Sequence, residues 1–251
     1  SGSMEWHCCD LRSVDLDALD LRGRFSVIVA DPPWDIRMKL PYRTLRDEEI
    51  LQLPVEELAV PDDWCLLFLW VTGRTAALGR QCMSHWGFQR VEDIVWVKRL
   101  PHQDGDSVVE RTGHWLNHDK EHCLVGLRLP ASAKGSGEEL RGSPLEDVIV
   151  AVPREPSRKP DELYELIEAL LSPLEGSCCR QKIELFGRPH NRRPGWVTLG
   201  NELPATESPS PSSSLSPPRK RRELLHVAEA SQSLGGINPQ GPGDGATEDQ
   251  K

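Results

Sequence analysis

The sequence lacks the features that mark membrane and secreted proteins. No run approaches 18 consecutive apolar residues, and no signal-peptide pattern is visible. We therefore expect a soluble protein that is not secreted and does not contact a membrane. The seven cysteines include no C-x-x-C pair, and their odd number favours reduced thiols over a disulfide framework. Cys65, Cys82 and Cys123 lie within apolar segments, which predicts small core residues.

Several common catalytic signatures are also missing. The chain has no G-x-S-x-G nucleophile elbow, no G-x-x-x-x-G-K phosphate loop and no G-x-G-x-x-G after a strand. No nucleophilic triad is apparent either. These absences argue against a serine hydrolase, a P-loop nucleotidase and a protein with a standard dinucleotide-binding fingerprint.

An excess of positive charge is absent too. The formal net charge is -9, and residues 1–203 hold 25 basic against 33 acidic side chains. A protein that coats nucleic acid through bulk charge is therefore excluded. Any contact with nucleic acid must come from local basic patches or from a partner.

Composition divides the chain into three parts. Residues 1–3 resemble an expression scar, residues 4–203 are the expected folded domain, and residues 204–251 are the expected disordered tail. The tail is rich in Pro, Ser and Gly and has no aromatic residue, so it cannot bury enough surface to offset its ordering entropy. Its basic cluster Arg219–Arg222 is compatible with nuclear import, and the alternative is an inert solvated tail.

Apolar runs of strand length recur between helical patterns. The predicted strands are Phe25–Ala30, Cys65–Val71, Val91–Val97, Cys123–Leu129, Asp147–Val152, Lys182–Phe186 and Trp196–Leu199. The predicted helices are Arg74–Trp86 and Pro160–Leu171, the second with acidic residues in its first turn. Near-continuous apolar strands that alternate with helices predict an α/β domain with a mostly parallel sheet and helices on both faces. Ligands then bind beyond the carboxyl ends of the strands.

Asp31-Pro32-Pro33-Trp34 comes directly after the first predicted strand. The Asp31 carboxylate and the Pro32 carbonyl can both accept hydrogen bonds from an exocyclic amino group of a nucleobase. Proline offers no competing N–H, and the Trp34 indole offers a face on which a planar base can stack. This tetrapeptide therefore indicates methylation of a base amino group, against the simpler alternative of a strand-terminating turn.

A second candidate element is Ile183–Asn191, with the sequence IELFGRPHN. A buried strand that ends in Phe-Gly lets the backbone approach a ligand closely, because glycine has no Cβ. Polar side chains follow at once, and Asn201-Glu202 follow the next strand. The element is a plausible floor for S-adenosylmethionine, and the alternative is a strand followed by a polar surface loop.

His114, His118, His122 and Cys123 have the spacing of metal ligands on a helix. Gly113 and Asn117 make this stretch a poor helix, however. We expect hydrogen-bonding roles in a binding loop and no metal site.

Read together, these residues closely resemble the MT-A family of adenine N6-methyltransferases. Five segments carry the resemblance: ADPPWDI at 30–36, FLWVTGR at 68–74, RTGHWLNHDKEHCLVG at 111–126, KPDE at 159–162 and IELFGRPHN at 183–191. The resemblance spans about Cys8 to Leu203. It implies a Rossmann-like methyltransferase fold that uses S-adenosyl-L-methionine, with the acceptor motif placed before the Phe-Gly cofactor strand, a permuted order.

The resemblance also implies a role for particular residues. The expected catalytic residues are Asp31, Pro32, Pro33 and Trp34. The expected cofactor-binding residues are Asp10, Leu11, Asp31, Lys159, Phe186, Gly187, Arg188, His190, Asn191, Asn201 and Glu202. The expected substrate-binding residues are Trp34, Tyr42, Lys98, Glu121, Arg37, Lys39 and Arg43. Where the family usually has Asn-Gln, this chain has Asn201-Glu202, which puts the affinity for the cofactor in question.

We therefore predict methyl transfer to the N6 of adenosine in RNA, in the nucleus, by the catalytic subunit of a heterodimer with a degenerate sister subunit. Two alternatives stay open. The first is a DNA adenine methyltransferase, because D-P-P-W recognises the amino group and not the sugar. The second is an inactive scaffold of the same fold. The basic loop with Arg37, Lys39, Arg43 and Arg46 either touches the phosphate backbone or is a solvated gate loop.

Overall fold

The computed structural model describes residues 3–36, 43–99, 116, 118–130, 145–172 and 180–205. They belong to one compact unit that extends from Ser1 to Ser208. Beyond residue 205 the predicted tail lies outside the described residues, so the boundary at 203/204 stays a prediction. The elements in chain order are β1 (Glu5–Cys8), β2 (Val27–Ala30), α1 (Asp47–Leu51), β3 (Cys65–Val71), α2 (Ala76–His85), β4 (Gln89–Lys98), β5 (Lys120–Arg128), β6 (Val148–Ala151), α3 (Glu162–Leu171), β7 (Lys182–Leu185) and β8 (Trp196–Gly200).

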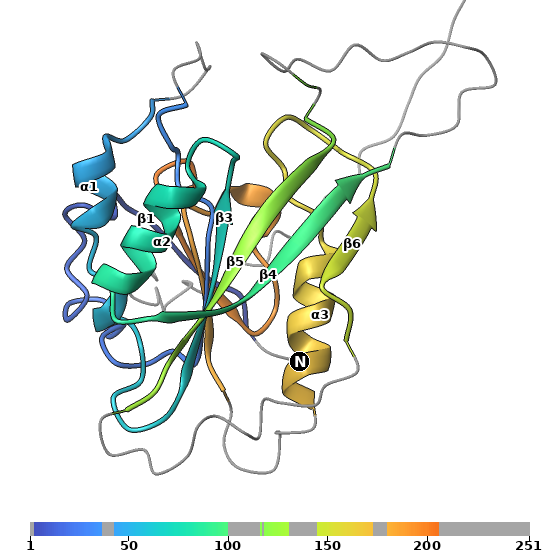
Figure 1. Ribbon diagram of the computed structural model, residues 1–251. Helices are drawn as coiled ribbons and strands as arrows, with labels where there is room; N and C mark the ends of the chain where they lie inside the picture. The colour runs from blue at the N-terminus through green and yellow to red at the C-terminus, as the bar shows by residue number, and fades with distance from the viewer. Residues whose placement is uncertain are drawn as a thin grey trace, which may run out of the picture. The chain divides into compact units, whose positions relative to one another are not determined.

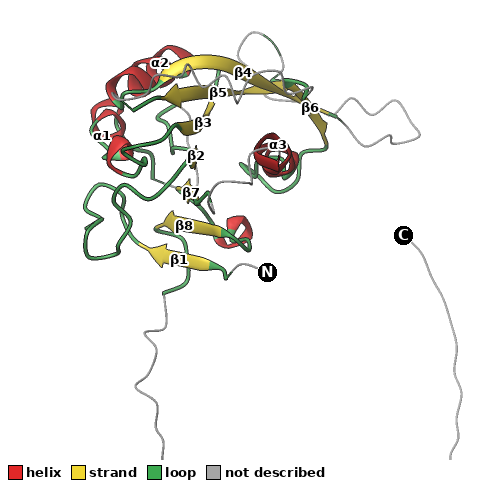
Figure 2. Ribbon diagram, turned by 90° about the horizontal axis from the view of Figure 1, so that it is seen from below, coloured by secondary structure: helices red, strands yellow, loops and turns green. Residues whose placement is uncertain are grey.

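The strands form one mixed sheet in the order β1-β8-β7-β2-β3-β5-β4-β6. Among the described strands, β5 alone runs antiparallel to its neighbours β3 and β4, and the other pairs are parallel. An α/β domain with a mostly parallel sheet is therefore confirmed. The central strands β2, β7 and β3 are adjacent, so their carboxyl ends meet at one edge of the sheet (Figure 2).

Both faces of the sheet are covered, as the apolar strands predict. Alternate residues of β3 point to opposite sides, with Leu67 in one core cluster and Phe68 in the other. The first cluster contains Cys82 and Met83 of α2, and the second contains Leu163 of α3. Figure 1 shows α1 and α2 on one face of the sheet and α3 on the other.

The structure differs from the sequence-based prediction at two elements. The edge strand β1 has the sequence EWHC and is only half-buried, so it carries no apolar run to reveal it. Helix α1 has five residues and buries only Ile50, too few for a helical period to show. The other strands and helices lie within a few residues of their predicted bounds, and Cys65, Cys82 and Cys123 are buried as expected. None of the helices in the described ranges is long and apolar enough to span a membrane.

The ends of β7 and β8 approach each other more closely than side chains would allow. A Cβ on Gly187 would lie 2.2 Å from Cγ2 of Thr198, and a Cβ on Gly200 would lie 2.1 Å from the carbonyl oxygen of Gly187. The Gly187 N–H donates to the Leu199 carbonyl at 2.8 Å. Glycine is therefore required at both positions by contact with neighbouring atoms.

We predict that Gly200→Ala lowers the free energy of unfolding by roughly 3 kcal/mol or more, because backbone must move to admit the methyl group. Urea denaturation of the purified protein measures this. Gly73→Ala is the control, since no atom lies within 4 Å of its Cβ position. Equal stability of both variants would contradict the close approach.

Candidate functional site

A cavity of about 700 Å³ opens at the carboxyl edge of the sheet. Every described residue that the sequence predicts for a site lines it. These residues are Asp10, Leu11, Asp31, Pro32, Pro33, Trp34, Arg43, Lys98, Glu121, Lys159, Phe186, Gly187, Arg188, His190, Asn191, Asn201 and Glu202. The remaining three, Arg37, Lys39 and Tyr42, lie outside the described residues.

The sheet topology explains how residues so far apart in sequence meet. Asp31 follows β2 and Phe186 follows β7, and these two strands are parallel neighbours. Strand β5 runs the opposite way, so its first residues reach the same edge as the last residues of β4. This reversal brings Glu121 beside Lys98, with Nζ 2.6 Å from Oε1.

Asp31 belongs to a chain of alternating charges in the wall of the cavity. The Lys159 Nζ lies 2.8 Å from Oδ2 of Asp31 and 3.4 Å from Oε2 of Glu121. Glu121 in turn pairs with Lys98. The side chain of Lys159 is only 13% exposed and lies over the Trp70 ring, so this network is shielded from bulk water.

The network shifts the ionisation of its members. Burial opposes charge on Lys159, but Asp31 and Glu121 together raise the pKa of its ammonium well above the ordinary value. Burial also opposes charge on Glu121, and Lys159 and Lys98 outweigh it and lower its pKa. For Asp31, burial raises the pKa although Lys159 pulls it the other way. Lys159 therefore stays cationic and holds Asp31 in place.

The D-P-P-W segment is held rigidly. The Trp34 indole N–H donates to the Trp70 carbonyl at 2.9 Å, and Trp34 is 4% exposed. Leu45 N–H donates to the Pro33 carbonyl at 2.9 Å, which ties D-P-P-W to the residues that precede α1. The indole therefore anchors the loop in the core, and most of its surface is covered by protein, contrary to the open stacking face suggested by the sequence.

The Pro32 carbonyl is also partly engaged. The Trp34 backbone N–H donates to it at 2.8 Å. The prolines thus remove two competing donors, but the residue after them supplies one. Because a carbonyl oxygen has two lone pairs, one acceptor position remains for a ligand.

The Phe-Gly element forms a strained turn at the end of β7. Phe186 has φ of 62°, a left-handed conformation that non-glycine residues rarely adopt outside constrained sites. The next residues are fixed by hydrogen bonds, since Arg188 N–H donates to Oδ1 of Asn191 at 2.8 Å. Arg188 also pairs with Glu202 at 3.3 Å. The carboxylate at position 202, which departs from the family pattern, therefore has a cation to bind.

Asp10 carries its own partner. Arg12 donates to both carboxylate oxygens of Asp10, with Nη2 2.6 Å from Oδ2, and its Nη1 lies 2.7 Å from Oε1 of Glu49 in α1. Hydrogen bonds from the Arg12 side chain lower the pKa of Asp10 to about 2. The N-terminal wall of the cavity is thereby tied to the helix that follows the D-P-P-W loop.

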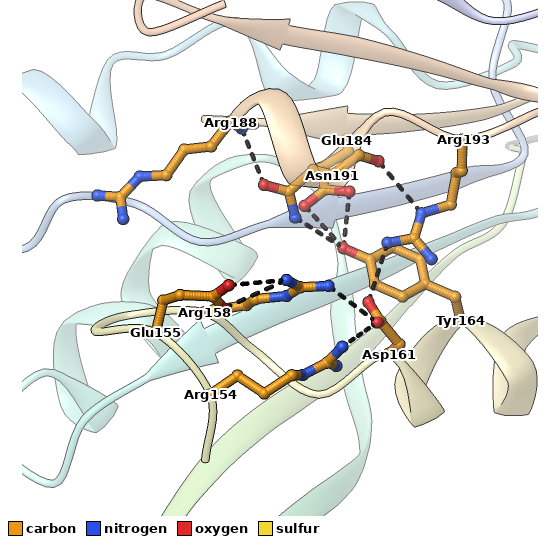
Figure 3. Close-up of polar contacts among 9 residues, drawn as sticks. All are labelled: Arg154, Glu155, Arg158, Asp161, Tyr164, Glu184, Arg188, Asn191 and Arg193. Carbon is orange, nitrogen blue, oxygen red and sulfur yellow. Dashed lines mark hydrogen bonds and ion pairs between the residues drawn. The ribbon is translucent and has the colours of Figure 1, made fainter. Parts of the chain in front are cut away.

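Sequence reasoning missed Glu184 on β7. This carboxyl group is 4% exposed and lines the cavity, and Tyr164 Oη donates to it at 2.7 Å. Asn191 Nδ2 donates to the same Tyr164 oxygen at 3.2 Å. Figure 3 shows the Tyr164 hydroxyl pointing toward Glu184 and Asn191, and Arg193 lies over the Tyr164 ring. The only sequence signal was a lone acidic residue inside an apolar strand.

Burial raises the pKa of Glu184 to about 8, although the Tyr164 hydrogen bond and Arg193 oppose the shift.

Trp70 was missed for a different reason, because its sequence pattern is that of a core residue of β3 and only the fold places it in the cavity wall. Within the described ranges no group of side chains is arranged to hold a metal ion. His122 lies 3.3 Å from Asp93, and His114 is outside those ranges.

The fold and the cavity together define an α/β protein with a cavity at the carboxyl ends of parallel strands. The particular family follows from comparison with known sequences. The MT-A70 family model matches residues 25–202, and the chain belongs to this family.

Individual relatives agree with the family. The chain is 49% identical over 201 residues to the human N(6)-adenosine-methyltransferase catalytic subunit METTL3, covering 79% of this chain and 31% of that protein. It is 48% identical over 204 residues to the MT-A70-like N(6)-adenosine-methyltransferase of Arabidopsis thaliana, covering 80% and 27%. It is 30% identical over 208 residues to the non-catalytic subunit METTL14 of Drosophila melanogaster, covering 77% and 50%. The chain thus spans about a third of the length of the catalytic relatives.

The raised pKa of Glu184 has a consequence for stability. The folded protein binds a proton at Glu184 between about pH 4.5 and about pH 8, where the unfolded chain does not, so the stability from this group falls as pH rises through that window. We predict that the unfolding free energy of the wild type falls by about 2 kcal/mol more between about pH 6 and about pH 8 than that of Glu184→Gln does. Urea denaturation at the two pH values measures it, and parallel profiles of wild type and variant would refute it.

Proposed function

We propose that this chain transfers a methyl group from S-adenosyl-L-methionine to the N6 amino group of adenosine in RNA. The observation that carries this proposal is the position of Asp31 and the Phe186-Gly187 turn on adjacent parallel strands in one cavity. The membership in the MT-A70 family supports it, and so does the similarity to relatives named N(6)-adenosine-methyltransferases. The chain order, with D-P-P-W before the Phe-Gly strand, supports the permuted Rossmann-like arrangement.

The cavity residues fit an S-adenosylmethionine molecule. The Gly187 and Gly200 backbones leave no room for a side chain between them, and the left-handed Phe186 turns the backbone toward the cavity. Around this turn, Asn191, Asn201 and Glu202 offer groups for ribose hydroxyls, and Lys159 offers a cation for the methionine carboxylate. Asp10 and Leu11 would meet the adenine. The sulfonium of the cofactor supplies an activated methyl group.

The acceptor chemistry depends on Asp31 and Pro32. The lone pair of adenine N6 is delocalised into the ring, which makes it a poor nucleophile. The Asp31 carboxylate and the free acceptor position of the Pro32 carbonyl would each accept one N–H and localise that lone pair. The alkylated amine then loses its proton readily, so no strong base and no covalent intermediate are required. Positioning and electrostatics supply most of the rate.

We predict that Asp31→Ala abolishes methyl transfer, at least about a thousandfold, because both the acceptor hydrogen bond and the Lys159 pair are lost. Asp31→Asn keeps the shape of the side chain but not its charge, and its rate of methyl transfer should also be lower by at least about a hundredfold. Transfer of labelled methyl from the cofactor to an adenosine-containing RNA measures both. Circular dichroism confirms that the variants fold, and full activity of either would overturn the assignment.

The same assay separates the alternatives. Matched RNA and DNA oligonucleotides, each with and without a METTL14-type subunit, are presented with labelled cofactor. Methylation of RNA only supports the proposal, methylation of DNA supports the DNA enzyme, and none under any condition supports an inactive scaffold.

We further propose that the chain works as a heterodimer with a homologous non-catalytic subunit. The relative of that description in Drosophila supports a partner of the same fold. The sheet edge at β6 offers a surface for it. Val148 and Val150 are 45% and 59% exposed, and they pair in register with Val95 and Val97 on the face opposite α3. Alternate residues Ile149 and Ala151 are buried. Exposed apolar surface of this kind marks interaction sites.

Val150→Asp should weaken co-purification with a co-expressed METTL14-type subunit by about tenfold or more, because a charge would be buried at the interface. Met4→Asp is the matched control, since Met4 is 52% exposed and precedes β1 at the opposite edge of the sheet. Unchanged association of the Val150 variant would place the partner elsewhere.

Nuclear localisation is part of the same proposal. It is supported by the basic cluster Arg219–Arg222, which lies outside the described residues.

The charge of the RNA substrate also favours a partner. RNA is negatively charged, and the acidic domain alone is poorly suited to hold it, so a partner subunit would complete the binding groove.

A further inference from the structure

The cavity holds one more buried acid than it needs for its own ion pairs. Asp31 is paired with Lys159, and Glu121 is paired with Lys98. Glu184 is the third buried or half-buried carboxyl group of the inner wall. In the part of the chain that the structure describes, the Tyr164 hydroxyl is its hydrogen-bond partner and Glu184 forms no ion pair.

Burying a carboxyl group without a cation is costly. Glu184 pairs with Val29 of β2 and lies between Ile183 and Leu185, both of which are fully buried apolar residues. Unlike them, it is part of the cavity wall, next to the strand that ends in Asp31. Its position therefore serves something that enters the cavity.

We propose that Glu184 is the counter-charge of the positive methyl donor and makes the cavity prefer that donor over its demethylated product. This inference rests on the proposed methyltransferase function. In the transfer, the S–CH3 bond breaks as the N–CH3 bond forms, the electron pair stays on sulfur, and the amine proton leaves. The sulfonium thus becomes a neutral thioether, while the adenosine and amino acid parts are common to donor and product. An ionised Glu184 side chain discriminates between the two by charge and favours release of the product.

The groups that face Glu184 are consistent with this role. From α3 and its N-terminus come Tyr164 and Asp161, and from the loop after β7 come Asn191 and Arg193. From β2 comes Asp31, whose charge disfavours a second carboxylate until a cation arrives. From β8 comes the neutral Thr198, which pairs with Glu184 in register. His190 lines the same cavity, but burial lowers its pKa, so it is neutral above pH 7.

A binding experiment without RNA tests the proposal. Isothermal titration of the full chain with S-adenosylmethionine, with its cationic amine analogue sinefungin and with S-adenosylhomocysteine gives three dissociation constants. Glu184→Gln should weaken both cationic ligands about tenfold and the neutral thioether less than about twofold. Glu168→Gln is the matched control, because it removes the same charge from α3, where Glu168 pairs with Lys182 outside the cavity.

A second measurement needs no variant. Because Glu184 would give up its proton when a cation binds, the donor should release roughly half a proton more than the thioether at about pH 7.5. Titration in two buffers of different ionisation enthalpy measures this difference. The preference for the donor should also rise between about pH 7 and about pH 9 in the wild type and stay flat in Glu184→Gln.

The outcomes separate two failures. If none of the three ligands binds the wild type, the proposed function itself fails, and this inference fails with it. If all three bind but Glu184→Gln weakens them equally, with equal proton release for donor and thioether, Glu184 only supports the fold of the wall. Selective loss of the cationic ligands, absent from Glu168→Gln, is the result that supports the counter-charge.

Discussion

The parallel pairing of β2 with β7 is the constraint on which the site depends. It places the residue after Ala30 beside the residue after Leu185, and so brings Asp31 to the Phe186-Gly187 turn across about 150 residues of chain. Parallel strands end at the same edge, and elements held at strand ends are positioned more precisely than elements on long loops. At the same edge, Gly187 and Gly200 allow the chain after β7 to approach the end of β8 closely.

A second feature is the way in which buried charge is distributed around Asp31. Lys159 is held between Asp31 and Glu121, and Lys98 completes the alternation. Such a network keeps each group oriented, because every charge has a partner and none is free to leave the low-dielectric wall. It requires the reversed strand β5, since Glu121 at its start reaches the carboxyl edge only if the strand runs backwards. The charge network of the site therefore depends on the direction of β5 in the sheet.

Much of this was open to prediction from particular residues. The β3 strand was bounded correctly because Cys65–Val71 is apolar without interruption, which is the pattern of a strand buried on both faces. D-P-P-W and the Phe-Gly element were found because their chemistry is unusual for turns, and the cavity contains both. Strand β1 and helix α1 were missed because neither carries a hydrophobic period long enough to register.

By itself, the sequence determined the class of fold, the candidate residues at the ends of strands and the kind of chemistry that they suit, because these depend on local pattern and residue type. The three-dimensional contacts were needed to show which of those residues share a cavity, that the Trp34 indole is anchored on Trp70, and that Glu184 lines the cavity. The reason is physical. Burial, register and partner charge come from contacts between segments distant in the chain, and a lone acid in an apolar strand does not show which of them it will meet.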